Sequence, residues 1–426
     1  MRFFLSTTAL AALAALAPFS VSAQSPACTH TVGMVVSLTG AAGRFGQAAS
    51  KSVELAFNEL NTAGGAQGIA GCKLAFDLRD AQSQGSVAVD QARQLVDLKK
   101  VPAIIGGIIS SVSIPMLTSV TGPAGVVQIS PASSSPTLTR LAADGKTNGW
   151  FFRTITSDAL QGTAAAKYAL DQGMRNLTII HVNNDFGVNM LAEFRKAYEA
   201  LGGKISSVTP YNPQQPSYNA EVTNALKGDP PALYFIGYPG DGTTIVRTWI
   251  QQGGPQRFLL NDGMNAADFI KGVGPQFLAN AFGTSSGSTT TPSTEFFAKA
   301  YPAMSGGFDA GAPAADRAFD AGAILGLAIA HAGKFEAAAI RDSIRKVTEP
   351  GGEVVYASPQ GFARALQLIR EKKAVRYVGV IGGVQFDRFG DIVGPFRTWR
   401  ITNGEVVTVG QMSTDEVQAI QARMPK

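Results

Sequence analysis

The chain has few of the side chains that hold metal ions. Its 426 residues include only three histidines, His30, His181 and His331, and only two cysteines, Cys28 and Cys72. Zinc and most transition metals need several such ligands at set spacings, so we expect no metal site. Charged residues are also scarce, at 16% of the chain against roughly 25% in typical domains. Hydrophobic residues make up 45%, which excludes a disordered chain.

Clustered positive charge is absent as well. Lysine and arginine number 36 against 31 acidic residues, which gives a net charge of +5, but the basic residues form no run. Because nucleic-acid binding needs a concentrated basic surface, we expect no nucleic-acid partner. Outside the N-terminus, no apolar stretch reaches the roughly 18 residues that a membrane-spanning helix needs.

The N-terminus has the layout of a secretory signal peptide. Arg2 is followed by the short apolar block Ala9–Ala17 and by the small residues Val21-Ser22-Ala23, an order that predicts cleavage after Ala23. The alternative, a membrane anchor, would need a longer apolar block. Ser25 stands where a lipidated Cys28 would require leucine, so we expect export to a Gram-negative periplasm without lipidation.

Cys28 and Cys72 fit an oxidising compartment. Cys28 shortly precedes the apolar run Val32–Leu38, and Cys72 opens the run Cys72–Leu78. In a parallel βαβ unit two such strands are commonly neighbours, so the cysteines should lie close enough to bridge. Two free buried thiols are the alternative, and an exported protein favours the disulfide.

Short β-rich runs alternate with helical patterns along most of the chain. We expect strands at Val32–Leu38, Leu74–Asp77, Ala103–Gly106, Val126–Ile129, Leu177–Val182, Ile205–Thr209, Leu233–Ile236 and Phe258–Leu260. From about residue 286 the pattern becomes mainly helical, and it ends in a β-rich tail at Tyr377–Phe386 and Phe396–Thr408. Alternating βα units predict the α/β class, with two blocks of doubly wound parallel sheet.

Three segments mimic enzyme motifs without their context. The glycines of Thr39–Gly46 do not match the spacing of a dinucleotide-binding loop. Gly283–Gly287 matches G-x-S-x-G but runs into a serine- and threonine-rich loop, where a nucleophile elbow needs a helix. His331, the only later histidine, lies in an apolar helical stretch. No acid, base and nucleophile come together, so we expect neither an enzyme nor a cofactor.

Polar residues follow several predicted strands. Gly106–Ser111 and Ile129–Pro136 are serine-rich and run from a strand into a helix. Hydroxyls and free backbone N–H groups at such junctions suit a carboxylate, although serine there is also the ordinary helix cap. In the second block, Asn261–Gly263 and Tyr238–Gly240 also end strands. Acidic Asp262 facing two serine-rich junctions would match an amino-acid zwitterion.

At these residues the chain resembles the periplasmic leucine/isoleucine/valine-binding protein family, whose members serve ABC transporters. The resemblance covers nearly the whole mature chain. Five segments carry it, which are Val32–Gly46, Asn61–Gly71, Ile129–Pro136, Asn183–Gly187 and Tyr377–Gly404.

The resemblance implies the type I periplasmic binding protein fold, in which two Rossmann-like lobes are joined by a three-strand hinge. It divides the chain into a signal peptide at 1–23, a first lobe at 28–153 and 286–388, a second lobe at 154–285 and 389–410, and a C-terminal tail at 411–426.

The resemblance also implies a ligand site between the lobes. Ser110, next to Ser111, and Ser134 would bind the ligand carboxylate, Ala132 and Asp262 would bind its ammonium, and Phe45, Phe186, Tyr238 and Phe319 would line the pocket. Phe45 and Phe186 replace tyrosines of the leucine-binding proteins, and the stretch Pro350–Arg376 is longer than theirs. The ligand is therefore open among an amino acid, an amide and an aromatic or aliphatic carboxylate.

The function implied by the resemblance is a monomeric periplasmic receptor of an ABC importer. It would capture a small-molecule ligand and deliver it to the ABC permease at the inner membrane. The alternative is a sensory or regulatory module of the same fold with no role in transport.

Overall fold

The first lobe is built on a parallel five-stranded sheet. The computed structural model describes residues 28–424, so the predicted signal peptide lies outside the described residues. The strand order is β2-β1-β3-β4-β5. Their bounds are β1 Thr29–Val36, β2 Lys73–Asp80, β3 Ala103–Gly106, β4 Val127–Ser130 and β5 Phe151–Arg153. All four strand pairs are parallel.

The second lobe is built on a seven-stranded sheet of order β15-β14-β10-β9-β8-β6-β7. Its strands are β6 Asn176–Val182, β7 Lys204–Tyr211, β8 Leu233–Ile236, β9 Phe258–Leu260, β10 Ala281–Ser286, β14 Phe396–Thr402 and β15 Glu405–Met412. β6 to β10 pair in parallel, whereas β14 and β15 add an antiparallel edge. A small third sheet joins β11 Glu353–Tyr356, β12 Val375–Gly379 and β13 Gly382–Gly383.

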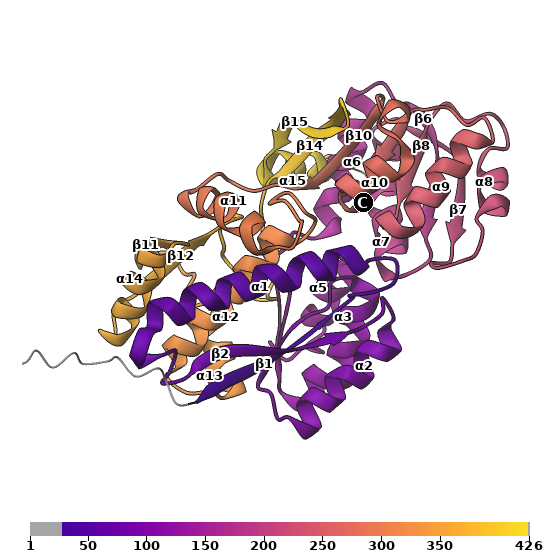
Figure 1. The fold of residues 1–426 in the computed structure, drawn as a ribbon. Helices are drawn as coiled ribbons and strands as arrows, with labels where there is room; N and C mark the ends of the chain where they lie inside the picture. Colours follow the sequence, from indigo (N-terminus) through magenta and orange to yellow (C-terminus); the bar gives the residue numbers. More distant parts are fainter. Residues whose placement is uncertain (1–27, 425–426) are drawn as a thin grey trace, which may run out of the picture.

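Helices cover both large sheets (Figure 1). Those of the first lobe are α1 Gly43–Gly64, α2 Gly85–Arg93, α3 Ser110–Met116, α4 Gly122–Ala124, α5 Pro136–Ala143, α11 Pro292–Met304, α12 Ala315–Ala332, α13 Ala337–Ile344 and α14 Pro359–Arg370. Those of the second lobe are α6 Asp158–Asp171, α7 Asp185–Ala200, α8 Asn219–Ala225, α9 Pro239–Gln251, α10 Ala267–Val273 and α15 Thr414–Ala422. Within residues 28–424 no single helix is long and apolar enough to cross a membrane, and only the strongly bent pair α12 and α13 reaches that length and composition together.

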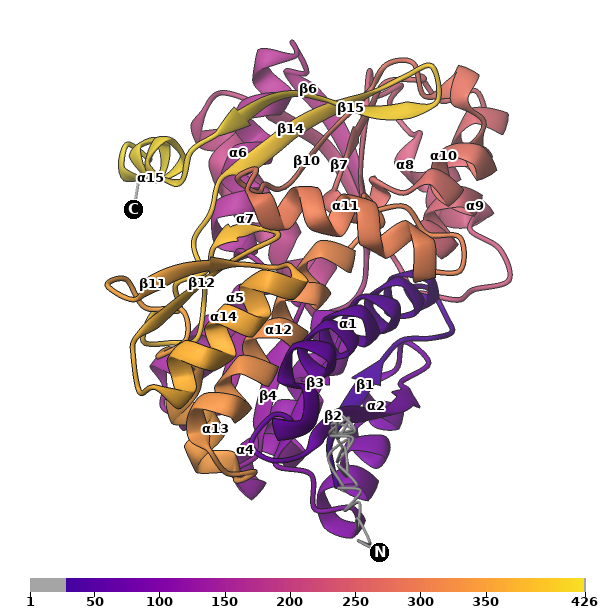
Figure 2. The ribbon, with the colours of Figure 1, turned by 60° about the vertical axis from the view of Figure 1, so that its left-hand side comes forward.

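The chain passes between the lobes three times. The crossings are residues 154–157 after β5, 287–291 after β10, and 384–395 between β13 and β14. Figure 2 shows α12 behind α1 in one lobe, with β14 and β15 in the other. Two doubly wound α/β lobes joined by three crossing segments are the predicted fold, which is confirmed.

The structure differs from the sequence-based prediction at three places. β10 contains glycine, threonine and two serines instead of an apolar run, so its composition resembles a loop. The predicted strand Tyr377–Phe386 is broken, because the chain turns back at Gly382, whose φ of 105° disfavours other residues. The predicted C-terminal tail contains the end of β15 and then α15, which packs on α6 through hydrogen bonds from Gln421.

The predicted disulfide between Cys28 and Cys72 is confirmed. β1 and β2 pair in parallel with Thr29 opposite Lys73, so each cysteine immediately precedes a paired strand start. Their Cα atoms lie 4.9 Å apart, and the bridge spans a sequence separation of 44.

Removing this bridge should cost stability and leave ligand binding intact, since it lies at the strand starts, at the far end from the ligand edge of the sheet. A loop of this size typically contributes roughly 2–4 kcal/mol to the free energy of unfolding. We expect the double variant C28S/C72S to unfold at lower denaturant concentration with unchanged ligand affinity. The intact protein should have a mass two hydrogens below the reduced one, and two alkylatable thiols in it would contradict the bridge.

Candidate ligand-binding site

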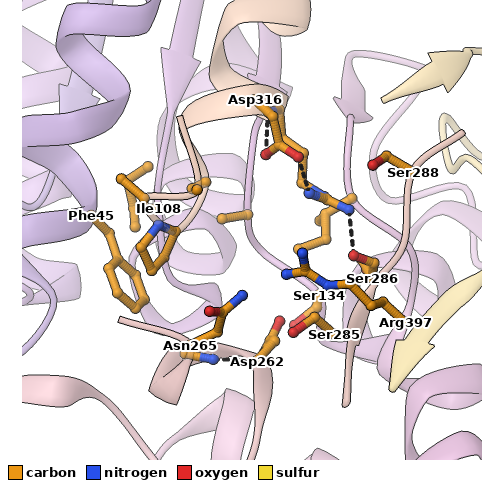
Figure 3. A pocket seen from close by; sticks show the side chains of 18 of the residues that line it. Phe45, Ile108, Ser134, Asp262, Asn265, Ser285, Ser286, Ser288, Asp316 and Arg397 are labelled. Atoms are coloured by element: carbon orange, nitrogen blue, oxygen red, sulfur yellow. Dashed lines mark hydrogen bonds and ion pairs between the residues drawn. The ribbon is translucent and has the colours of Figure 1, made fainter. Parts of the chain in front are cut away.

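A cavity lies between the two lobes and encloses about 250 Å³. It forms where β1, β3 and β4 of the first lobe and β8 and β9 of the second lobe end. Open parallel sheets bind ligands at these carboxyl ends. Figure 3 shows side chains from both lobes pointing into the cavity.

Seven of the nine predicted site residues line this cavity. They are Phe45, Ser110, Ala132 and Ser134 from the first lobe, and Phe186, Tyr238 and Asp262 from the second.

The other two predicted residues, Ser111 and Phe319, do not line the cavity. Ser111 follows Ser110 on α3 and is turned away by the helical rotation. Phe319 is fully buried in the core, with its ring centroid 5.3 Å from that of Phe297. Because successive residues of a helix turn by about 100°, Arg317 on α12 faces the cavity while Phe319 faces the core.

An aromatic wall closes one side of the cavity. Phe45 and Phe186 occupy matching positions in the two lobes, each immediately before a glycine in the first turn of a helix. A Cβ atom on Gly46 would clash with the carbonyl oxygen of Ser37, and one on Gly187 with that of Val182. These glycines therefore let each helix begin close against its strand, which brings both phenylalanines to the cavity.

Tyr238 joins the two phenylalanines of this wall. Its ring centroid lies 6.5 Å from that of Phe45 and 5.6 Å from that of Phe186. The Tyr238 hydroxyl accepts a hydrogen bond from Nδ2 of Asn184 at 3.2 Å, so the wall presents ring surface to a ligand.

The two serines carry hydroxyls with different partners. Oγ of Ser110 accepts a hydrogen bond from the backbone N–H of Ser135 at 3.1 Å, which leaves its own proton to donate. Oγ of Ser134 lies 2.9 Å from Oδ2 of Asp158. Burial raises the pKa of Asp158 well above its usual range, and the nearby charge of Asp262 raises it further. In this structure the Ser134 hydroxyl donates to Asp158, so it must rotate to donate to a ligand carboxylate.

Asp262 is the acidic group of the second lobe. Its Oδ1 accepts hydrogen bonds from the N–H of Gly263 at 2.9 Å and from Nδ2 of Asn261 at 3.2 Å. Burial raises the pKa of Asp262 above its usual value. A cationic group in the cavity would favour the ionised form of this carboxylate.

Next to Ser134 lie buried polar groups that the sequence did not single out. Asp158 is fully buried, and its Oδ1 and both amide atoms of Gln161 have no hydrogen-bond partner among residues 28–424. Asp158 follows the capping residue Ser157 at the start of α6, where an acidic residue is the ordinary complement to the helix dipole. Because an acidic residue at a helix start is so common, the sequence contains no sign that Asp158 lies next to the site.

Two arginines also line the cavity, Arg317 on α12 and Arg397 on β14. Arg317 lies 2.7 Å from Asp316 and donates to the backbone carbonyls of Ser286, at the end of β10, and Gly287, at the start of the second crossing. The side chain of Arg397 makes no ion pair or hydrogen bond with residues 28–424, and its Nε is buried without a partner. Neither arginine follows a parallel strand, so inspection of strand ends could not find them. The sequence signal that could have identified them is an arginine within an otherwise apolar helix or strand.

A third arginine, Arg153, positions the loop that carries Ser134. Arg153 is fully buried and holds both carboxylate oxygens of Asp391, at 2.7 and 3.0 Å. It also donates to the carbonyls of Ser133 and Ser135, each at 3.1 Å. The arginine therefore ties the serine junction after β4 to the third crossing.

The rim of the cavity is bridged from lobe to lobe. Arg44 on α1 lies 2.6 Å from Asp268 on α10, with about half of each side chain exposed. Arg140 donates to Oδ1 of Asn189 at 2.8 Å. These contacts join the two lobes across the rim.

The enzyme-like segments have structural roles. Ser285, within Gly283–Gly287, lies on β10 and accepts a hydrogen bond from Nε1 of Trp399 at 2.8 Å. His331 lies 3.0 Å from Oγ of Ser343. No group of three or more potential metal ligands occurs among residues 28–424.

Comparisons with known proteins agree with this architecture. The sequence pattern of the family described as periplasmic binding protein matches residues 29–371. An amino acid binding protein of Pseudomonas aeruginosa is 28% identical over 249 residues, which are 58% of this chain and 64% of that protein. The chain thus spans less than two thirds of that relative.

Two further proteins match most of the chain. A chemotactic signal transduction system substrate-binding protein of Halobacterium salinarum is 25% identical over 388 residues, 89% of this chain and 88% of that protein. The crystal structure of a leucine binding protein from Thermotoga maritima has a TM-score of 0.75 at 22% identity, covering 91% of this chain and 99% of that chain. The chain belongs to the periplasmic binding protein family, as its resemblance to the leucine/isoleucine/valine-binding proteins predicts.

Proposed function

We propose that this protein is the exported solute receptor of an ABC importer. It captures a small amino acid or a related carboxylate or amide between its lobes and delivers it to the permease at the inner membrane. One observation carries the proposal, which is the cavity between the lobes, lined by serine hydroxyls and Phe45 of the first lobe and by Phe186, Tyr238 and Asp262 of the second.

Ligand capture is tested by a thermal-shift screen of the mature protein over amino acids, amides, and aromatic and aliphatic acids. A ligand at 100 times its dissociation constant adds about 2.7 kcal/mol to the free energy of unfolding. We expect at least one class to raise the melting temperature in proportion to the logarithm of its concentration. A screen in which no compound does so would contradict the proposal.

The two serine hydroxyls are proposed to bind the ligand carboxylate. A hydrogen bond to a charged group contributes roughly 1.5–3 kcal/mol, so S110A and S134A should each weaken binding about tenfold or more. S135A is the matched control, because Ser135 caps α5 through the N–H of Thr137 and does not line the cavity. Calorimetry distinguishes ligand binding from helix capping. If the serines only cap helices, the substitutions should lower the free energy of unfolding by about 1 kcal/mol and leave ligand affinity unchanged.

Sensing is a second candidate function, favoured by the similarity to the chemotactic substrate-binding protein of Halobacterium salinarum. The two functions separate in cells that lack this chain. Loss of uptake of the screened ligand supports transport, whereas normal uptake with a lost behavioural or transcriptional response to that ligand supports sensing.

A further inference from the structure

The cavity contains one positive charge that the protein itself does not compensate. Arg397 lies on β14 in the second lobe, and Figure 3 shows its side chain reaching into the cavity. No carboxylate of residues 28–424 lies within ion-pair distance of it, and its Nε is buried without a partner.

Two buried arginines, Arg153 and Arg317, show how the protein pairs a guanidinium with its own groups, although the Nε of Arg317 also lacks a partner. Arg153 holds a carboxylate with two hydrogen bonds and also donates to two backbone carbonyls. Arg317 is paired with Asp316 and fixes two carbonyls of the second crossing. Arg397 has neither kind of partner.

The local charges favour an anion next to Arg397. Arg317 and Asp316 neutralise each other, so Arg397 leaves this end of the cavity with one net positive charge. Ser285 adds a donor there, because its Oγ already accepts from Trp399 and keeps its own proton. Arg397 is half-buried, with its Nε shielded from water, and a charge that loses part of its hydration without a partner is destabilising; a ligand carboxylate would compensate it.

We propose that Arg397 is the cationic partner of the ligand's acidic group and that the protein therefore selects organic acids over their neutral amides. This inference rests on the proposed function and narrows it. The hydroxyls of the serine junctions add neutral hydrogen bonds, whereas Arg397 supplies the charge. With Asp262 in the same cavity, an amino acid with a free carboxylate satisfies both charged groups.

The first test needs no ligand. R397Q should melt at the same temperature as the unaltered protein or higher, because a half-buried charge without an ion-pair partner disappears. R400Q is the matched control, since Arg400 is an exposed residue on the same strand. A loss of stability in R397Q comparable to that of an Arg153 variant would contradict the inference, because it would show that Arg397 is structural.

The second test compares acids with their amides. The probes are leucine and leucinamide, phenylalanine and phenylalaninamide, and benzoate and benzamide, measured by thermal shift and calorimetry. Loss of one partner of a buried charge pair costs about 30-fold or more in affinity. We expect the unaltered protein and R400Q to prefer the acid of a binding pair by at least about that factor, and R397Q to lose the preference.

The outcomes separate the two proposals. A panel in which no compound stabilises the unaltered protein would contradict the proposed function. Binding of an amide as tightly as its acid, or a preference for the acid that persists in R397Q, would contradict only the role of Arg397.

Discussion

Replacing Asp262 by alanine should abolish useful binding of any ligand that carries an ammonium group. Asp262 lines the cavity. Asn261 and Gly263 both donate hydrogen bonds to its Oδ1, which leaves Oδ2 for a ligand. Removing one partner of a buried charged pair costs roughly 2–5 kcal/mol. That range corresponds to about 30-fold to a few thousand-fold in affinity.

The same substitution should be neutral or favourable for a ligand that lacks the amine. In that case the carboxylate has no cationic partner, and its loss removes a poorly solvated charge beside Asp158. Calorimetry on both forms of the protein measures the difference. D268A is the control, because Asp268 lies at the exposed rim. Undiminished amino-acid affinity in D262A would falsify the ammonium role and leave Asp262 as the residue that caps Gly263.

Replacing Arg153 by methionine should produce the largest loss of stability among the variants considered. The change leaves the Asp391 carboxylate, which is only 7% exposed, without its cation, and it frees the carbonyls of Ser133 and Ser135. Breaking a buried pair in this way costs roughly 3–5 kcal/mol.

Chemical denaturation of R153M and R364M tests this expectation. Arg364 also holds both oxygens of a carboxylate, that of Glu353, but both side chains are largely exposed. Solvent screens a pair this exposed, so its loss should change stability little. Equal losses in the two variants would show that burial does not govern the strength of these pairs. Because Arg153 fixes the loop of Ser134, R153M should also bind ligand more weakly, whereas R364M should not.

The predictable part of the fold follows from local patterns. Apolar runs such as Val126–Ile129 and Leu233–Ile236 are fully buried strands flanked by helices, so composition alone located them. β10 escaped because its glycine, threonine and serines are buried by Trp399 and its neighbours across the sheet. That burial is a tertiary effect, which a local pattern does not contain.

The site residues also divide into those that local patterns predict and those that depend on tertiary packing. Phe45, Phe186 and Tyr238 follow parallel strands, and topology alone brings such positions to one edge. Arg317 and Arg397 reach the cavity from a later helix and an antiparallel strand, whose placement depends on three chain crossings. Phe319 was predicted at the site by position along α12, but a shift of two residues on a helix moves a side chain to the opposite face.

The ion pair between Arg44 and Asp268 also bears on how the protein exchanges its ligand. A pair this exposed contributes at most about 1 kcal/mol, which shifts an equilibrium between open and closed lobes by only about fivefold. Raised ionic strength weakens it further. The rim pair therefore does not lock the lobes, and under the proposed function most of the free energy of closure must come from the bound ligand. Under the proposed function, a permease that recognises the closed outline would therefore meet mainly loaded copies.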